Sequence, residues 1–373
     1  MLLGGPLQAS AASMYVPSQL RSAYDVPANL TGSGQTIVII AGYQSPVVQG
    51  DLAMFDAAFG LPPASLDIVA PDGTTPFNPM DPIQFGWAVE ESSDVEWAHS
   101  IAPGAHLVLV EGKTGNDADL LSATKYAIDK NLGGVISMSF SEAESCPSAG
   151  FLADEHKAFE RAAARGITLL AASGNHGPMQ PTCDGSPVPA VGTPASDPLV
   201  TAVGGTNLTL DPSTGAYVSE EAWTGSGGGF SSVYSRPAYQ APFQKNRKAR
   251  GVPDVAWHAS PATPTPVVVN HKLHPDAGTS IATAQWAGVV ALADQAAGHR
   301  LGAINGLLYR AAKGEGEQKR FHDLTSSKHG WDAVTGLGSP DVANLVAWIA
   351  GHAGNHGNGG NDGNDGNDGH DGE

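Results

Sequence analysis

The 373-residue chain has few basic residues and little charge of either sign. It carries 19 Lys and Arg against 37 Asp and Glu, a net charge of −18, and only 15% of its residues are charged. A nucleic-acid partner is therefore not expected, because phosphate contacts need a clustered basic face. A surface with many carboxyl groups and few cations carries modest charge in acid and avoids positive self-repulsion there. The composition thus suits a protein that is exposed to acid rather than an ordinary cytosolic one.

Long apolar runs are also missing. No run reaches the roughly 18 residues that indicate a membrane helix, although 41% of the residues are hydrophobic. We therefore expect a protein that forms a core and has no membrane partner. The N-terminal residues lack the basic and apolar regions of a signal peptide. Either the protein is not exported by that route, or the chain begins after export and processing.

Cysteine is scarce, with only Cys146 and Cys183 in the chain. The two could form one disulfide, but a sequence does not show whether their Cβ atoms meet. Two unpaired thiols, packed as small hydrophobic side chains, fit the sequence equally well.

What the chain does have is a series of short apolar runs bounded by glycines, which is typical of buried parallel strands. These runs lie at 34–42, 106–112, 133–140, 166–174 and 198–205. Helical patterns are found at 87–100, 117–130 and 152–166, and further helices are expected from Thr279 and near 339–351. Strands that alternate with helices predict an α/β fold with a parallel sheet.

One folded domain is expected over residues 15–351. Residues 1–14 form a lead-in to it. Residues 352–373 repeat Gly, Asn and Asp and offer almost nothing to bury, so we expect a disordered tail.

The strongest local signal for chemistry is Gly278-Thr279-Ser280, where the long helix is expected to begin. A serine in the first turn of a helix lies where unpaired backbone N–H groups point, and such donors stabilise a developing oxyanion. An isolated Ser or Thr at this place is more commonly a helix cap. The motif alone therefore only suggests a nucleophile.

A serine nucleophile needs a base, and two kinds of base are available. His99 and His176 are the histidine candidates. Glu90 and Asp94 are spaced i, i+4 and would lie on one face of the helix predicted over 87–100. Two close carboxyl groups share a proton, which raises one pKa, and can take a proton from serine at a pH where imidazole is already protonated.

The neighbours of this pair complicate its interpretation. Glu91 and Glu96 lie in the same segment, and acidic clusters are usually solvated faces. Spacing alone therefore favours a solvated face of the helix.

A third element is Asn175, in Ala-Ser-Gly-Asn-His-Gly at the end of an apolar strand. Its amide NH₂ could donate to an oxyanion. The alternative is an Asn-containing turn, which is common.

Together these segments resemble the sedolisin family, serine-carboxyl peptidases of the kumamolisin-like kind that share the subtilisin-like fold. The resemblance runs from about Tyr15 to about Ala350. Its motifs are GQTIVII, DLAMFDAAFGLP, EWAHSIAPGA, VISMSF, VTAVGGT, SGGGFS, RGVPDVAW, AGTSIATAQWAG, RLGAINGLLY and WDAVTGLGSPD. It implies a three-layer α/β fold, in which helices flank a mostly parallel central sheet.

The resemblance also implies roles for particular residues. Ser280 matches the nucleophile, Glu90 the general base and Asp94 the acid that orients it, whereas Glu91 and His99 lose any catalytic role. Asn175 stands where the family normally has an Asp, and Asn donates a hydrogen bond at every pH. We therefore expect activity to extend further towards neutral pH than in relatives with Asp.

Substrate and metal contacts are implied in the same way. Ser137 and Ser139 resemble the strand along which a substrate backbone pairs, and Gly228 belongs to a loop near the cleft. One structural Ca²⁺ is expected, held by oxygens of Asp323, Leu324, Lys328, Gly330 and Asp332. The stretch between these ligands is short and Lys328 stands where a Gly carbonyl is usual, so a calcium-free loop is the alternative.

The function implied by the resemblance is that of a secreted, monomeric endopeptidase that cuts polypeptides in acid through an acyl-enzyme on Ser280. The large prodomain usual in the family does not precede Tyr15 in the sequence. Two explanations stay open: the chain is a processed or truncated form, in which residues 1–14 could be a prosegment remnant, or the protein folds without that segment. Three alternatives stay open. The chain could be a tripeptidyl exopeptidase of the same family, an inactive binding protein on this scaffold, or a histidine-based serine hydrolase.

Overall fold

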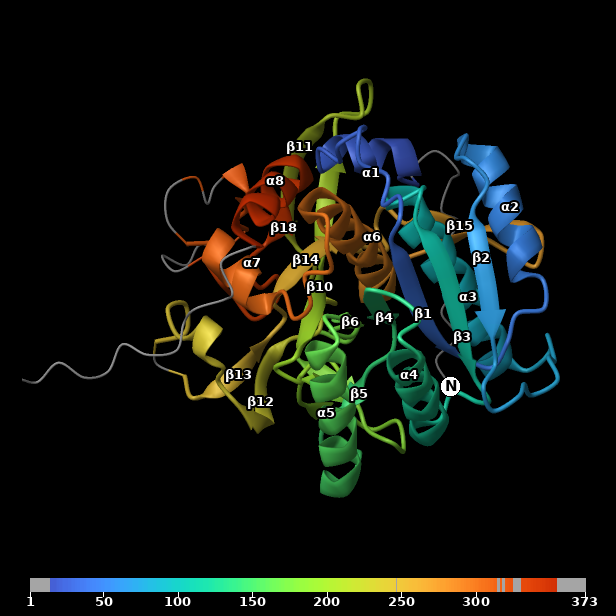
Figure 1. The fold of residues 1–373 in the computed structure, drawn as a ribbon, viewed down its shortest axis with the longest axis horizontal. Coiled ribbons are helices and arrows are strands. Elements are labelled where there is room, and N and C mark those ends of the chain that lie inside the picture. The colour runs from blue at the N-terminus through green and yellow to red at the C-terminus, as the bar shows by residue number, and fades with distance from the viewer. Residues whose placement is uncertain (1–13, 246, 314–315, 317–318, 325–329, 354–373) are drawn as a thin grey trace, which may run out of the picture.

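The computed structural model describes residues 14–353 except 246, 314–315, 317–318 and 325–329. The expected lead-in lies almost entirely outside the described residues, and so does nearly all of the expected tail. Figure 1 shows a central sheet with helices on both faces.

The sheet has eight strands and is mostly parallel. In order across the sheet, seven of them are β11 (Tyr217–Ala222), β10 (Val200–Leu210), β6 (Thr168–Ala172), β4 (Val135–Met138), β1 (Thr36–Gly42), β3 (His106–Gly112) and β2 (Ser65–Val69). The eighth, β14 (Val255–His258), pairs with β10 in parallel, and only β11 runs antiparallel to its neighbour. All five strands predicted from the apolar runs lie in this sheet, so the predicted α/β class is confirmed.

The helices divide between the two faces of the sheet, and strand β1 shows why. Its side chains alternate: Ile37 and Ile39 belong to the core on one face, Val38 and Ile40 to the core on the other. The first core is covered by α3 (Pro82–Ile101) and α6 (Thr279–Ala297), the second by α4 (Asp117–Lys130) and α5 (Ala149–Ala164).

Further helices pack around α3 and α6. They are α1 (Pro17–Ala23) and α2 (Val48–Phe59) against α3, α8 (Val342–His352) against α6, and α7 (Asn305–Ala311) against α8. Short paired strands complete the fold: β5 (Glu142–Ala143) with β9 (Gly192–Thr193), β7 (Met179–Pro181) with β8 (Pro187–Pro189), β12 (Gly229–Ser235) with β13 (Ala249–Val252), β15 (Thr265–Val269) with β16 (Lys272–Asp276), and β17 (Phe321–His322) with β18 (Ser339–Pro340).

Helix α3 is covered on every side over its second half, where all residues from Glu91 to Ile101 are buried. Helix α6 packs directly against it, and a Cβ added at Gly288 would lie 2.6 Å from the Cβ of Ile101, so glycine is needed for this close approach. The solvated acidic face that spacing favoured for this segment is therefore wrong. The acids lie inside because helices and strands pack against all faces of α3.

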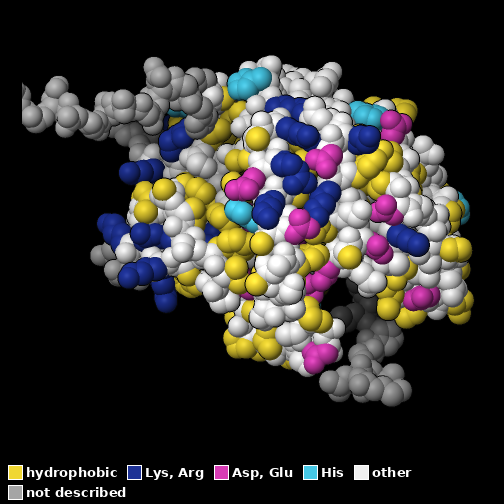
Figure 2. Space-filling model, turned by 60° about the horizontal axis from the view of Figure 1, so that its bottom comes forward, with side chains coloured by type: hydrophobic (Ala, Val, Ile, Leu, Met, Phe, Trp, Pro, Cys, Tyr) yellow, Lys and Arg dark blue, Asp and Glu magenta, His cyan; other side chains and the backbone are white. Residues whose placement is uncertain are grey.

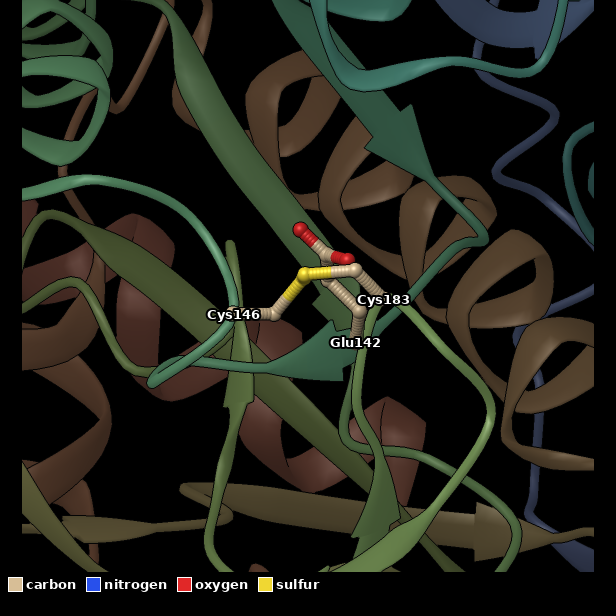
Figure 3. A group of neighbouring side chains, drawn as sticks. All are labelled: Glu142, Cys146 and Cys183. Atoms are coloured by element: carbon tan, nitrogen blue, oxygen red, sulfur yellow. A yellow bond between two sulfur atoms is a disulfide. The ribbon is translucent and has the colours of Figure 1, made fainter.

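The two cysteines form a disulfide between Cys146 and Cys183, whose Cα atoms are 5.5 Å apart. The bond joins the segment after β5 to the turn between β7 and β8. Figure 3 shows that the side chain of Glu142 lies beside it, and a carboxylate oxygen of Glu142 is within 4.8 Å of both sulfur atoms. Because the two sulfur atoms are bonded to each other, neither is a thiolate that could bind a metal ion, and we assign no metal site to these three residues.

The basic residues are unevenly spread over the surface. Figure 2 shows Lys and Arg side chains gathered on the face that carries α4 and α5, with acidic side chains among them. Lys125 pairs with Asp154, and Arg161 and Arg165 both pair with Asp129. Within the described residues, no helix combines the length and the apolarity needed to cross a membrane.

Candidate active site

A cavity of about 390 Å³ opens where the carboxyl ends of β4 and β6 meet the N-terminus of α6. Open parallel sheets characteristically bind ligands at the carboxyl ends of their strands. Glu90, Ser139, Asn175 and Ser280 all line this cavity. Residues from four distant parts of the sequence thus converge on one hollow.

The predicted carboxyl pair lies one helical turn apart on α3. Glu90 reaches the cavity, whereas Asp94 is fully buried behind it. The hydroxyl of Ser139 donates a hydrogen bond of 2.7 Å to Oδ1 of Asp94. Glu90 Oε1 and Asp94 Oδ2 are buried and accept no hydrogen bond from the described residues. Both carboxyl groups therefore have an oxygen available for a shared proton.

The surroundings favour that proton. The pKa of Glu90 is raised well above its ordinary value by burial first, then by the negative charges of Asp94 and Asp276, and the Ser280 hydroxyl offsets part of this. The pKa of Asp94 is also raised well above its ordinary value, mainly by burial and further by Asp276, against the hydrogen bond from Ser139. The pair therefore keeps a proton at a pH where exposed carboxyl groups have lost theirs.

Asp276 is a residue that the sequence analysis missed. It ends β16, four positions before Ser280, and accepts a hydrogen bond from the hydroxyl of Ser93 on α3. It thereby adds a third carboxyl group next to the pair, and its own pKa is raised by burial. The only signal in the sequence is an Asp shortly before the Gly-Thr-Ser motif, and this spacing does not show that a hairpin turns it towards α3.

Ser280 is the second residue of α6. Its hydroxyl donates to the carbonyl oxygen of Ser139 at 3.3 Å, and it is close enough to Glu90 to lower the pKa of that carboxyl. Gly278, with a φ of +146°, precedes the helix, and the first-turn N–H groups have no intrahelical acceptor. The Ser280 hydroxyl thus lies between a carboxyl group and a set of backbone donors.

The Asn175 side chain is oriented by Thr279. Its Oδ1 accepts hydrogen bonds from the backbone N–H of Thr279 at 2.8 Å and from the Thr279 hydroxyl at 3.0 Å. The same hydroxyl accepts from the N–H of Gly174 at 3.1 Å, which fixes its direction. Because two donors identify the oxygen of the amide, the NH₂ group is the part of Asn175 that can donate into the cavity.

Two further predicted residues lie away from the cavity, and one histidine lies within it. Ser137 is fully buried in the middle of β4, and its neighbours β1 and β6 pair on both sides, so Ser139 is the part of this segment that reaches the cleft. Gly228 packs against the backbone of Ala333, where an added Cβ would approach the carbonyl oxygen to 1.9 Å. His176 lines the cavity, but within the described residues no hydrogen bond joins it to Ser280.

His99 has a structural environment. It is fully buried, and its Nε2 lies 2.8 Å from the carbonyl oxygen of Pro62 and 3.3 Å from a carboxylate oxygen of Asp56. It does not line the cavity. Its position agrees with the loss of a catalytic role that the resemblance implies.

The predicted calcium ligands are only partly described. Lys328 lies outside the described residues. Gly330 is near the carboxylate of Asp323, since an added Cβ would lie 3.8 Å from Oδ2. Asp332 accepts hydrogen bonds from the backbone N–H groups of Val334 and Thr335. The oxygen donors on either side of 325–329 suit Ca²⁺, and a carboxylate that caps a turn can still offer a lone pair to it.

Comparison with known proteins shows which family and which relatives this chain resembles. Residues 86–331 match the family model described as the subtilase family. Kumamolisin of Bacillus sp. (strain MN-32) is 33% identical over 364 residues, which cover 89% of this chain and 63% of the relative. Sedolisin of Pseudomonas sp. (strain 101) is 28% identical over 370 residues, covering 92% and 62%. The chain therefore spans somewhat less than two thirds of the length of these relatives.

A solved structure shows the same similarity to sedolisin. Pseudomonas sedolisin, a serine-carboxyl proteinase complexed with two molecules of pseudo-iodotyrostatin, matches with a TM-score of 0.81 and 27% identity, over 91% of this chain and 99% of that one. Tripeptidyl-peptidase 1 of Dictyostelium discoideum is 29% identical over 84% of this chain and 54% of the relative. From its fold, its motifs and these matches, the chain belongs to the subtilase family and, within it, to the sedolisins.

Proposed function

We propose that this protein is a serine-carboxyl peptidase that hydrolyses peptide bonds in polypeptides through an acyl-enzyme on Ser280. The observation that carries the proposal is the convergence of Ser280, Glu90 with Asp94, and the NH₂ group of Asn175 on one cavity. A nucleophile, a base and an oxyanion donor are the parts that acyl transfer needs.

In the first step, Ser280 Oγ attacks the carbonyl carbon of the substrate while its proton passes to Glu90. The carbonyl oxygen becomes an oxyanion, held by Asn175 Nδ2–H and the backbone N–H of Ser280. Glu90 then gives the proton to the leaving amine, and the C–N bond breaks. Water attacks the resulting ester with Glu90 again as the base, and Ser280 regains its proton as the acid product leaves.

Asp94 holds the proton that the pair shares, so that Glu90 is the ionised member when the serine attacks. Burial and mutual repulsion raise the pKa of both carboxyl groups, and the singly protonated pair is therefore the stable form in acid. We propose accordingly that activity peaks at acidic pH.

The test is the pH–rate profile on a denatured protein substrate. We expect an acidic optimum for the wild type, with losses of about 10²-fold or more for Glu90→Gln and complete loss for Ser280→Ala. His176→Ala, the matched control in the same cavity, should retain the profile. Activity that survives Glu90→Gln and disappears in His176→Ala would establish a histidine base instead, and no activity at any pH would favour a binding protein.

Endopeptidase action is proposed ahead of tripeptidyl release, although relatives named tripeptidyl-peptidases also match the chain. Digestion of a long peptide blocked at its N-terminus separates the two modes. Internal fragments identified by mass spectrometry are expected. Cleavage only after the block is removed, with release of tripeptides, would assign the exopeptidase mode.

We further propose one structural Ca²⁺ held by the carboxylates of Asp323 and Asp332 and by backbone carbonyl oxygens near them, and a monomer that works outside the cytoplasm. The disulfide between Cys146 and Cys183 supports that location, because such bonds persist in oxidising compartments. The ion would join the two sides of the 323–332 segment and take no part in the chemistry.

A further inference from the structure

A second cavity, of about 200 Å³, lies next to the active-site cavity. The two share Trp87, Phe140 and Ser141 in their walls. None of the residues proposed for catalysis lines the second cavity. It is therefore positioned to receive a part of the substrate at a distance from the bond that is cut.

The walls of this cavity combine apolar residues with carboxyl groups. Leu121 from α4, Met138 from β4 and Phe151 and Phe159 from α5 are among the apolar residues. Asp117, Glu142 and Glu155 supply the carboxyl groups. A cavity that has both apolar and acidic walls matches a long side chain that has an aliphatic stem and a cationic end.

Of the three carboxyl groups, that of Glu155 is held most firmly. Glu155 is only 6% exposed, and its Oε2 accepts a hydrogen bond of 2.9 Å from the hydroxyl of Thr193, while no described residue donates to its other oxygen. Glu142 lies beside the disulfide, which anchors its segment (Figure 3). Asp117 is the first residue of α4, and its carboxyl group lies close enough to Glu142 to raise the pKa of that residue.

No described Lys, Arg or His lines the cavity to neutralise these acids. Lys125 on α4 pairs with Asp154, and His156 on α5 pairs with Asp197 (Figure 2 shows this face). Burial, and then the neighbouring Asp117, raise the pKa of Glu142 to about 7. Burial raises the pKa of Glu155 to about 8, with Asp197, Asp117 and Glu142 adding to it. A cation that entered would meet acids with no competing positive charge.

We propose that this second cavity binds a Lys or Arg side chain of the substrate, at one position other than the two that flank the cleaved bond. The inference rests on the proposed function, because it assigns a substrate to the same cleft. The aliphatic stem would lie against the apolar walls, and the cationic end would meet Glu155 and the Asp117–Glu142 pair. Specificity for a basic residue would thus come from this cavity and not from the catalytic residues.

The experiment uses peptides in which one Lys, or its uncharged counterpart norleucine, is moved along an otherwise fixed sequence. Binding is measured by fluorescence anisotropy to the Ser280→Ala protein, and cleavage is measured with the active protein. At one position, we expect Lys to be preferred by about tenfold or more near pH 7, the range of a charge-assisted hydrogen bond. The preference should increase from about pH 5 to about pH 8, because the cavity acids lose their protons in this range.

Removal of the charge on the cavity wall tests the assignment. Glu155→Gln, and the same change combined with Glu142→Gln, should reduce the Lys to norleucine ratio to near one, because a neutral amide keeps the shape and removes the charge. Glu160→Gln is the matched control, since Glu160 is on the same helix but exposed on the surface. Thermal melting confirms that the variants are folded.

The outcomes separate this proposal from the proposed function. If the Ser280→Ala protein prefers Lys and the active protein cleaves nothing, peptidase activity fails and the cavity assignment stands. If peptides are cleaved with equal efficiency whether they carry Lys or norleucine at every position, the cavity assignment is overturned and the peptidase stands. A Lys preference that Glu155→Gln and the double variant leave unchanged also overturns it.

Discussion

The hydrogen bonds of Asn175 make a sharp prediction for Asn175→Asp. An Asp side chain can keep both contacts that Oδ1 makes now, with the backbone N–H of Thr279 at 2.8 Å and its hydroxyl at 3.0 Å. The position of the group should therefore change little. What is lost is the NH₂ group, which is replaced by an oxygen that donates only when it is protonated.

The size of the effect follows from the role of one oxyanion donor. Removing such a donor costs about 100- to 1,000-fold in kcat. Below the pKa of the new Asp its OH can donate, so activity in acid should be largely kept. Above that pKa the donor is gone and a negative charge faces the oxyanion, so the full loss should appear and the high-pH limb should move to lower pH.

The assay is kcat/KM against pH for the wild type, Asn175→Asp and Asn175→Ala on one peptide. Asn175→Ala is the control, because it removes the donor at every pH and should lower the whole profile without moving its limbs. A high-pH limb that stays in place in Asn175→Asp would refute the reasoning. It would mean that loss of the proton shared by Glu90 and Asp94 sets the upper limit of activity, whichever residue stands at position 175.

Three other changes follow from the same site. Asp276→Asn removes a negative charge that raises the pKa of Glu90, so Glu90 should ionise at lower pH and the acid limb of kcat/KM should move to lower pH; an unmoved limb would contradict the role given to Asp276. Gly278→Ala would place a Cβ 2.9 Å from Nδ2 of Asn175 at a φ of +146°, so we expect a stability loss of about 1–3 kcal/mol in denaturant unfolding, with weaker activity. Chelation of Ca²⁺ should lower the melting temperature of the wild type but not of Asp323→Asn, and equal melting with and without chelator in the wild type would remove the calcium proposal.

The sequence predicted the framework of the fold well because the framework depends on local patterns. Buried parallel strands appear in the sequence as short apolar runs between glycines. The helix expected over 117–130 is observed as Asp117–Lys130. The strand Ser65–Val69 was missed, because only one of its residues is buried and no apolar run marks it. Short edge elements carry too little pattern to be recognised.

The site was predictable only where a motif marks it. Spacing alone gave the wrong environment for the acids of α3, because i, i+4 periodicity shows which residues share a face but not what covers that face. Glu91 and Glu96 are as deeply buried as Asp94. Glu96 accepts a hydrogen bond from the backbone of Val268, 172 residues away, and a contact of that range has no local signature.

The acids of the second cavity show the same limit. Asp117, Glu142 and Glu155 belong to three elements, and each by itself looks like an ordinary surface acid in the sequence. Only the packing of α4 and α5 beside the end of β4 brings them together. The disulfide between Cys146 and Cys183 also constrains the segment next to Glu142, and the sequence did not show whether that bond forms.

The many buried acids also have a consequence for stability. Glu91, Asp94 and Glu96 have pKa values raised well above ordinary by burial, and burial raises the pKa of Glu111 and Asp294 to about 7. Each of these groups binds more protons in the folded protein than in the unfolded chain between its ordinary and its raised pKa. The free energy of unfolding should therefore fall as pH rises through this window, by up to about 1.4 kcal/mol per pH unit for each group.

This protein should accordingly be most stable in acid and lose stability from about pH 5 towards pH 8. Melting temperatures of the Ser280→Ala protein across that range test the idea without self-digestion. Glu111→Gln should flatten the slope, because an uncharged side chain at that buried position removes one of the contributing protons. A melting temperature that rises towards neutral pH would show that these carboxyl groups find partners or solvent when they ionise. A falling one would mean that the buried acids that serve the proposed chemistry also restrict the protein to acidic surroundings.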